Sequence, residues 1–259
     1  GSTGKYSVEL TTEPTSEVVL SVSVIHPDGT VLPDEVAIVD QDGADLTELR
    51  FTDEDWNVAQ VVTVTGVDDW IDDDDQATEI TFAVVDGSSA PEYVALAQSV
   101  WVITTDDDEA AFTVSPDADE SVLSDGKVKV TEAGSTGKYN VVLVTEPVSE
   151  VVLSVSVIHP DGTLGDDEVT VSPAELRFLP GVWNVAQVVT VDGVDDDIDD
   201  GDQNTEITVA VVDASSDAAY ADDPLVDDDP FVPAQSVWVI TTDDDEAAFT
   251  VSPDADESV

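Results

Sequence analysis

Apolar and polar residues alternate along most of this chain, in short runs rich in valine, isoleucine and threonine. Alternation over about four to eight residues buries one face of a β-strand, and no stretch shows the spacing of an amphipathic helix. In the second half of the chain the pattern predicts about seven strands. These strands cover residues 127–131, 139–144, 151–158, 175–178, 185–191, 205–212 and 236–241.

Turn-forming residues separate these runs. Pro-Asp-Gly at residues 160–162 and Pro-Gly at residues 180–181 are typical of tight turns between strands. Short alternating strands that are joined by turns, without helical segments, are the pattern of an antiparallel β-sandwich. The sequence therefore predicts an all-β fold.

Long segments of the chain occur twice, almost unchanged. The copies are residues 1–6 and 134–139, 56–64 and 183–191, 98–109 and 235–246, and 110–122 and 247–259. The repeating unit has the length of a whole domain rather than of a short solenoid repeat. We therefore expect two β-sandwiches in tandem.

The phase of the repeat suggests how the chain is divided. Residues 1–109 form one repeat that lacks its first strand or strands, and residues 110–246 form a complete repeat that opens with strands at 111–115 and 127–131. Residues 247–259 begin with a further copy of the first strand. This copy is either the first strand of a following repeat in a longer array, or a strand donated head to tail to a neighbouring copy of the chain.

The charge of the chain excludes several partners. Asp and Glu number 60 against 6 Lys and Arg, so the net charge is −54. Such a surface attracts cations and repels nucleic acid and anionic lipid, and no apolar run approaches the roughly 20 residues that would predict membrane insertion. The chain has no cysteine, which leaves neither disulfides nor thiolate chemistry.

Acidic residues also cluster in loops, which adaptation to a salty habitat does not explain. Residues 193–203 read G-V-D-D-D-I-D-D-G-D-Q between two predicted strands, and residues 66–76 read G-V-D-D-W-I-D-D-D-D-Q. Carboxylates this close repel one another unless a cation lies among them. Calcium fits best, because it accepts many carboxylate and carbonyl oxygens in loose geometry.

Seven segments of the second repeat carry a resemblance to a known family. They are residues 130–134, 139–143, 165–168, 176–181, 187–191, 195–198 and 243–245. Together they resemble the Calx-beta domain, the calcium-binding sandwich of sodium–calcium exchangers and of many large bacterial surface proteins. The resemblance implies two tandem antiparallel seven-stranded β-sandwiches of the immunoglobulin-like, Calx-beta-like type, each with calcium at one pole.

The resemblance also implies the calcium ligands. In the second repeat they are Glu132, Asp166 or Asp167, Asp195, Asp196, Ile198 through its carbonyl, Asp200, Asp243, Asp244 and Asp245. In the first repeat they are Asp34, Asp68, Asp69, Ile71 through its carbonyl, Asp73, Asp106, Asp107 and Asp108. The first repeat has no counterpart of Glu132, so its site is either incomplete or completed by a neighbour.

Catalytic signatures are weak. His26 and His159 are the only histidines, one in each repeat, which is too few for a zinc site. The acidic runs are polar and crowded, unlike the apolar cleft of a glycosidase. We therefore expect a non-catalytic calcium-binding repeat of an extracellular bacterial adhesin, matrix protein or filament, in which calcium stiffens the modules and their joints. The alternatives are a filament subunit that polymerises by strand donation, and an accessory domain of a secreted hydrolase.

Overall fold

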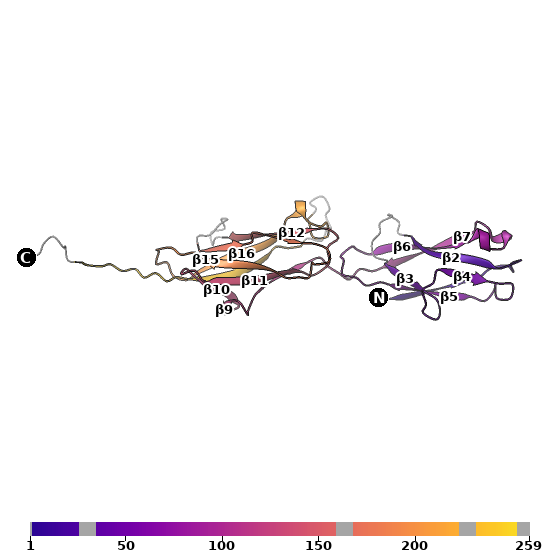
Figure 1. Ribbon diagram of the computed structural model, residues 1–259, viewed down its shortest axis with the longest axis horizontal. Coiled ribbons are helices and arrows are strands. Elements are labelled where there is room, and N and C mark those ends of the chain that lie inside the picture. The colour runs from indigo at the N-terminus through magenta and orange to yellow at the C-terminus, as the bar shows by residue number, and fades with distance from the viewer. Residues whose placement is uncertain (1, 26–34, 159–167, 223–231, 253–259) are drawn as a thin grey trace, which may run out of the picture. The chain divides into compact units, whose positions relative to one another are not determined.

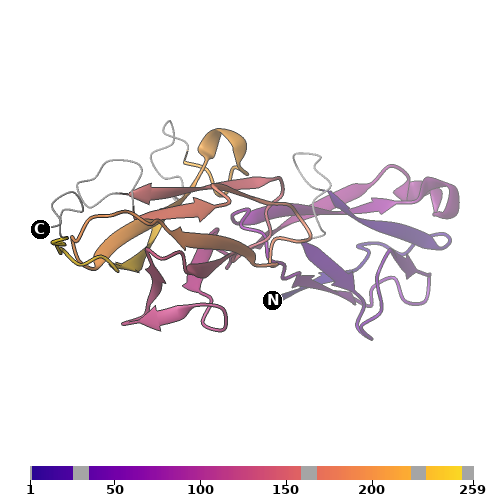
Figure 2. The same cartoon turned by 60° about the vertical axis from the view of Figure 1, so that its left-hand side comes forward.

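The computed structural model describes residues 2–25, 35–158, 168–222 and 232–252. The chain divides into two compact units, Gly1–Asp107 and Asp108–Val259, here called the first and the second unit. Both units are built from strands, as Figures 1 and 2 show. Helical structure in the described ranges is limited to the short 3-10 turns Asp86–Ser88, Pro91–Tyr93 and Asp213–Ser215, so none of it reaches the length of a membrane span.

The first unit is a sandwich of two antiparallel sheets, with strand orders β1-β5-β3 and β4-β2-β6-β7. Its strands are β1 (Thr3–Val8), β2 (Val18–Ile25), β3 (Val36–Val39), β4 (Glu48–Phe51), β5 (Gln60–Gly66), β6 (Gln76–Val84) and β7 (Ala97–Thr104). The inward residues of the two sheets form one core, which includes Val18, Phe51, Val62 and Ile80. Alternation along each strand places every second side chain in this core.

The second unit repeats this plan and extends it. Its sheets have the orders β13-β15-β11-β8 and β14-β12-β16-β17-β10-β9. The strands are β8 (Phe112–Pro116), β9 (Val122–Ser124), β10 (Lys127–Thr131), β11 (Thr136–Leu143), β12 (Val151–Ile158), β13 (Val169–Ser172), β14 (Glu175–Phe178), β15 (Gln187–Gly193), β16 (Gln203–Val211) and β17 (Gln235–Thr242). Its core includes Phe112, Tyr139, Leu153 and Ile207.

The all-β sandwich prediction is confirmed, but the second unit differs from the expected seven antiparallel strands. Its described residues form ten strands, and β10 pairs with β17 in parallel, with Val128 opposite Val239. The alternation pattern missed β9 and β13, which are only three and four residues long. The parallel pair arises because the chain crosses between the two sheets several times after β10, and β17 is the strand that finally lies beside it. No hairpin therefore forces the two strands to run in opposite directions.

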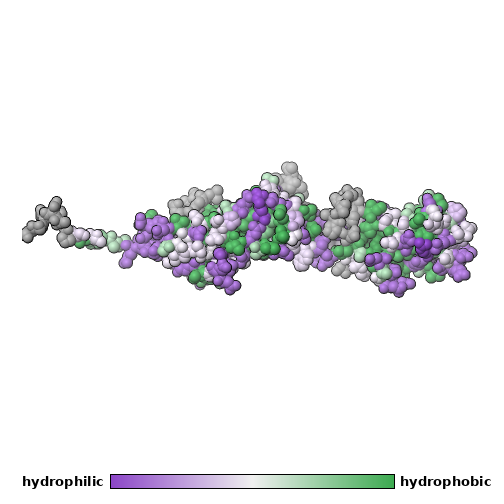
Figure 3. Space-filling model, viewed as in Figure 1, coloured by the Kyte–Doolittle hydropathy of each residue, from purple (hydrophilic) through white to green (hydrophobic). Residues whose placement is uncertain are grey.

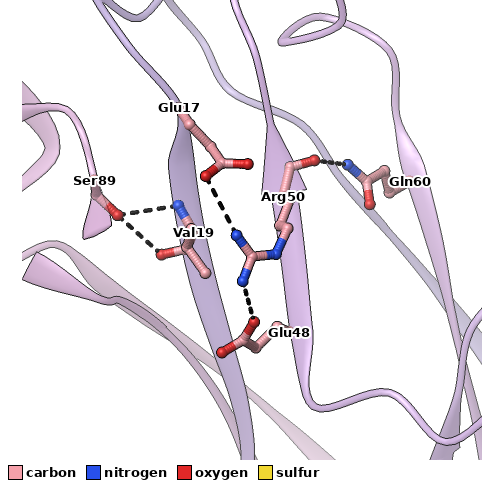
Figure 4. A network of polar contacts seen from close by, with 6 residues as sticks. All are labelled: Glu17, Val19, Glu48, Arg50, Gln60 and Ser89. Atoms are coloured by element: carbon pink, nitrogen blue, oxygen red, sulfur yellow. Dashed lines mark hydrogen bonds and ion pairs between the residues drawn. The ribbon is translucent and has the colours of Figure 1, made fainter. Parts of the chain in front are cut away.

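A cluster of ion pairs surrounds one exposed arginine in each unit. In the first unit, Arg50 on β4 contacts Glu17 at 3.2 Å and Glu48 at 2.8 Å (Figure 4). The side chain of Gln60 on β5 donates to the carbonyl of Arg50 at 2.6 Å. Arg177 repeats this arrangement in the second unit. Because these side chains are exposed, the ion pairs add little to stability.

The last described segment, residues 247–252, forms no strand. Figure 1 shows it running away from the sheets of the second unit, and in Figure 3 its atoms stand apart from the body of that unit. Phe249 and Val251 within it are 88% and 86% exposed. The segment therefore leaves two large apolar side chains in water.

Candidate metal centre

The site in the second unit begins where two parallel strands end side by side. Glu132 directly follows β10 and Asp243 directly follows β17. The backbone amide of Glu132 donates to the carbonyl of Thr242 at 3.2 Å, which continues the ladder by one residue. Parallel neighbours end at the same edge of a sheet, so this pairing brings the two carboxylates together.

The acidic turn that follows β15 joins the site from the opposite sheet. Gly193 ends β15, and a Cβ atom at this position would lie 2.2 Å from the carbonyl oxygen of Thr131 on β10. Only glycine permits this approach of two backbones. The next residue, Val194, donates to the carbonyl of Glu168 at 2.9 Å, which places Glu168 beside the turn.

Two groups of carboxylates result. Glu132, Asp243 and Asp245 form one, and Glu132, Glu168 and Asp200 form the other; within each group one oxygen per residue lies within 4.8 Å of the others. Both groups contain Glu132. All donors are carboxylate oxygens, which are the ligands of hard cations such as calcium, whereas zinc favours histidine and cysteine.

Glu132 is the centre of this arrangement. Its side chain is 2% exposed, and its Oε2 atom has no hydrogen-bond partner. Burial and the nearby charge of Asp243 raise the pKa of Glu132, while a hydrogen bond from the amide of Asp244 opposes the shift. A buried carboxylate with one unpartnered oxygen, surrounded by other acids, destabilises the fold, and a cation between Glu132 and its acidic neighbours would reduce that cost.

Hydrogen bonds shape the acidic loops around Glu132. Asp243 accepts the amide of Gly201 at 2.6 Å and the amide of Asp245 at 2.8 Å. These bonds, the one from Asp245 first, lower the pKa of Asp243 and keep it ionised. Gly201 has a φ of 76°, a left-handed conformation that favours glycine. The loops therefore present charged oxygens in a defined geometry.

The remaining ligands expected in the second unit occupy supporting places. Burial and several neighbouring carboxylates raise the pKa of Asp245, and Asp195 is the last of these neighbours in order of effect. Burial and the charge of Asp243 raise the pKa of Glu132, and the charge of Asp196 adds a smaller effect. The amide of Ile198 donates to Asp196 at 2.6 Å, and the carbonyl of Ile198 accepts the amide of Asp200 at 3.0 Å. The side chain of Asp244 is exposed.

The first unit has a related but looser cluster. Glu35 is 6% exposed, and its Oε1 atom has no hydrogen-bond partner. Burial, followed by the charges of Asp73, Asp69 and Asp106, raises the pKa of Glu35 to about 7. Burial, followed by the charges of Asp69 and Asp106, raises the pKa of Asp73 to about 6. Among the described residues of this unit, no three carboxylates approach one another as closely as those around Glu132.

The other residues expected to bind calcium in the first unit are spread around this cluster. Asp106 accepts the amides of Asp73 and Asp74 at 3.1 and 3.0 Å, and the amide of Ile71 donates to Asp69 at 2.8 Å. Asp68 and Asp107 are exposed, and Asp108 is the half-buried first residue of the second unit. Asp34, Asp166, Asp167, His26 and His159 lie outside the described residues.

The ligand set expected from the sequence did not include Glu35 and Glu168. Each occupies the last position before a strand, at the start of β3 and of β13, in the repeated triplet Asp-Glu-Val. The missing signal was therefore strand β13, whose first residue Val169 pairs with Gly193. With that pairing known, the residue before Val169 is expected to lie beside the acidic turn.

Comparisons with known proteins give remote similarities. No protein-family model and no curated protein matches this chain. The solved structure of the E. coli chaperone DraB matches 53% of the chain at 10% identity and a TM-score of 0.34, and the match spans 59% of that chaperone. The apo form of the Calx CBD1 domain matches 53% of this chain and 100% of its own length, at 13% identity and a TM-score of 0.32. At these TM-scores neither structure informs the function of this chain.

Proposed function

We propose that this chain is a non-catalytic, calcium-binding structural repeat of the Calx-beta type, from an extracellular bacterial adhesin, matrix protein or filament. The observation that carries the proposal is Glu132, a buried carboxylate with an unpartnered oxygen and further carboxylates on two sides. Two carboxylate groups that share one residue fit two neighbouring cation positions bridged by Glu132.

Calcium suits these donors better than other common cations. It takes about 6–8 oxygen ligands at roughly 2.3–2.6 Å and tolerates irregular geometry, whereas magnesium demands a compact octahedron. The loops around Glu132 supply many oxygens from four chain segments, which matches the calcium preference. Extracellular modules bind calcium weakly, with dissociation constants of about 10⁻⁴–10⁻³ M, so they fill outside the cell.

A structural rather than catalytic role follows from the same chemistry. Calcium would be held by Glu132, the acidic turn and the residues after β17, and therefore by both sheets of the second unit. Repulsion among carboxylates is thereby replaced by attraction to a shared cation. The module would gain stability and rigidity. We also propose that calcium stiffens the joints between modules.

Calorimetric titration and thermal unfolding test the proposal. Calcium is expected to raise the unfolding temperature as it saturates the site, and sodium chloride of equal ionic strength is expected to leave it nearly unchanged. Glu132→Gln is expected to weaken calcium binding at least about tenfold, which corresponds to about 1.4 kcal/mol. Glu54→Gln, an exposed change between β4 and β5, is the control. Equal stabilisation by sodium, or unchanged affinity in Glu132→Gln, would contradict a specific site.

A further inference from the structure

The first unit has an apolar groove between the free edges of its two sheets. The groove has a volume of about 310 Å³ and is lined by residues that include Tyr6, Val8 and Leu10 from β1 and its continuation, and Val100 from β7. In the described part of this unit, β1 and β7 each pair with one strand and end their sheets. Unpaired edges next to apolar side chains are templates for an added strand.

In the second unit the same place is filled by two strands, because β10 also pairs with β17, the counterpart of β7. Strand β8 pairs with β11, the counterpart of β1, with Phe112 opposite Leu143 and Val114 opposite Val141. Phe112 is 1% exposed, and Val114 packs against the core. The amide of Val144 donates to the carbonyl of Ala111 at 2.8 Å, and the side chain of Gln235 on β17 donates to the carbonyl of Phe112.

Residues around the groove differ between the two units, since neither β8 nor β10 has a counterpart among the described residues of the first unit. Tyr139 is buried and its hydroxyl donates to the carbonyl of Trp238 at 2.7 Å, whereas its counterpart Tyr6 is half-buried and the bond to Trp101 lengthens to 3.4 Å. Gln98, the counterpart of Gln235, is exposed. The groove therefore already has the side chains that hold β8 in the second unit.

The chain carries a strand with the matching sequence. Residues 247–252 read A-A-F-T-V-S, identical to residues 110–115, which contain most of β8. Phe249 and Val251 correspond to Phe112 and Val114, and they are exposed in this structure. The same acidic sequence, residues 106–109 and 243–246, precedes both copies. Strand β8 comes directly after the first unit in the chain and pairs within the second unit. Its copy comes directly after the last strand of the second unit, so it is suited to pair with a further unit.

We propose that residues 247–252 of one molecule add as a strand to β1 of a second molecule, antiparallel, and fill the groove of its first unit. The register of β8 on β11 places Phe249 opposite Leu10 and Val251 opposite Val8. The amide of Thr11 then donates to the carbonyl of Ala248, as Val144 does to Ala111. Repetition of this contact joins molecules head to tail, and it requires no calcium.

Light scattering coupled to size-exclusion chromatography tests the contact. The chain, with a mass of 27.3 kDa, is expected to form species of at least about twice that mass as its concentration rises, because strand addition depends on concentration. Phe249→Asp combined with Val251→Asp is expected to remain monomeric. Thr250→Asp combined with Ser252→Asp adds the same charge on the outward face and is expected to assemble. A monomeric parent chain at all concentrations, or assembly of the Phe249/Val251 variant, would overturn the proposal.

A disulfide test fixes the register, because the chain has no cysteine of its own. Glu9→Cys in one molecule and Thr250→Cys in another are opposite residues in the proposed pairing, so a mixture of the two variants is expected to form a cross-linked dimer on mild oxidation. Glu54→Cys mixed with Thr250→Cys is expected to form none. Equal cross-linking in both mixtures, or a disulfide within single molecules of the Glu9→Cys, Thr250→Cys double variant, would contradict donation to a second copy.

Discussion

Glu132 lies beside Asp243 because the two strands that precede them run in parallel. The hydrogen bond from the amide of Glu132 to the carbonyl of Thr242, at 3.2 Å, is the last link of the β10–β17 ladder. The two carboxylates are therefore anchored directly at the paired ends of β10 and β17. A site on a sheet edge loses little conformational entropy when a cation binds, which favours affinity.

Gly193 is expected to be essential for both stability and calcium binding. In Gly193→Ala the new methyl group would overlap the carbonyl of Thr131, because its position lies 2.2 Å from that oxygen. Overpacking of this kind costs about 1–3 kcal/mol, and it moves the acidic turn away from Glu132. Urea unfolding and calcium titration measure the two effects.

Gly66 supplies the matched control for that change. It holds the same place in the first unit, where a Cβ would meet Thr104 Cγ2 at 3.3 Å and the carbonyl of Ser2 only at 4.0 Å. Gly66→Ala is therefore expected to be milder than Gly193→Ala. Equal destabilisation by the two variants would contradict the close approach of β15 and β10.

Asp245 and Asp244 are neighbours with different expected roles. Asp245 belongs to a carboxylate group around Glu132, whereas the side chain of Asp244 is exposed and only its amide reaches Glu132. Asp245→Asn is expected to weaken calcium binding about tenfold or more, and Asp244→Asn only slightly, although both remove one negative charge. Isothermal titration distinguishes them. Similar losses would mean that net charge, and not coordination, sets the affinity.

Glu168 provides a separate test of the second carboxylate group. Its oxygen lies with those of Glu132 and Asp200, so Glu168→Gln is expected to reduce calcium affinity or the number of ions bound. Glu175→Gln, an exposed change in the nearby strand β14, is expected to leave both unchanged. Retention of full affinity and stoichiometry in Glu168→Gln would remove this residue from the site.

The first unit is expected to lose stability with rising pH when calcium is absent. The folded state raises the pKa of Glu35 from its usual 4.5 to about 7, with burial as the main cause. Its favourable contribution is thus present below about pH 4.5 and is lost as the pH rises through about 7, when the carboxylate ionises among other acids. Thermal unfolding in a chelator between about pH 5 and pH 8 measures this slope.

Glu35→Gln is expected to flatten that pH dependence, because the glutamine stays neutral throughout the range. Glu54→Gln, which removes an exposed charge, is expected to keep the slope. Calcium above about pH 7 is expected to restore stability in the parent chain. An unchanged slope in Glu35→Gln would show that other groups govern the titration.

Tyr220 gives a stability prediction that is independent of calcium. It is buried, and its hydroxyl bonds both the carbonyl and the hydroxyl of Thr145 at 2.7 Å. Tyr220→Phe is expected to cost about 1–3 kcal/mol in the free energy of unfolding, because the buried carbonyl of Thr145 loses its donor and the hydroxyl of Thr145 loses its acceptor. Calcium affinity is expected to stay unchanged. A loss of affinity would link this corner of the sandwich to the acidic pole.

The alternation of side chains was sufficient to predict the main strands and the class of the fold. Strands such as Val151–Ile158 were predicted with their observed bounds, because one face packs in the core along their whole length. The parallel pairing of β10 with β17 has no signature in alternation, since a strand buries the same face whichever way its neighbour runs. The sequence also did not reveal β9, which has three residues and little buried surface.

The residues of the candidate site were predicted only in part, because alternation does not reveal how strands pair. Glu132, Asp200, Asp243 and Asp245 follow predicted strands or lie in the repeated acidic turn. The structure brings Asp200 close to Glu132 in one carboxylate group, and Asp243 and Asp245 close to it in the other. Glu168 was missed because its position depends on β13, a short strand with only one fully buried residue, Val169. Acidic runs identify a site's composition, whereas strand pairing decides which oxygens meet.

The parallel arrangement of β10 and β17 also has a mechanical consequence. These strands lie near the beginning and the end of the second unit in sequence, and they are joined over four residue pairs, from Val128↔Val239 to Thr131↔Thr242. Tension that reaches β10 from its N-terminal end and β17 from its C-terminal end pulls the two strands in opposite directions along their own axes. The hydrogen bonds between them are then loaded in shear and must break together rather than one after another, so the unit resists stretching.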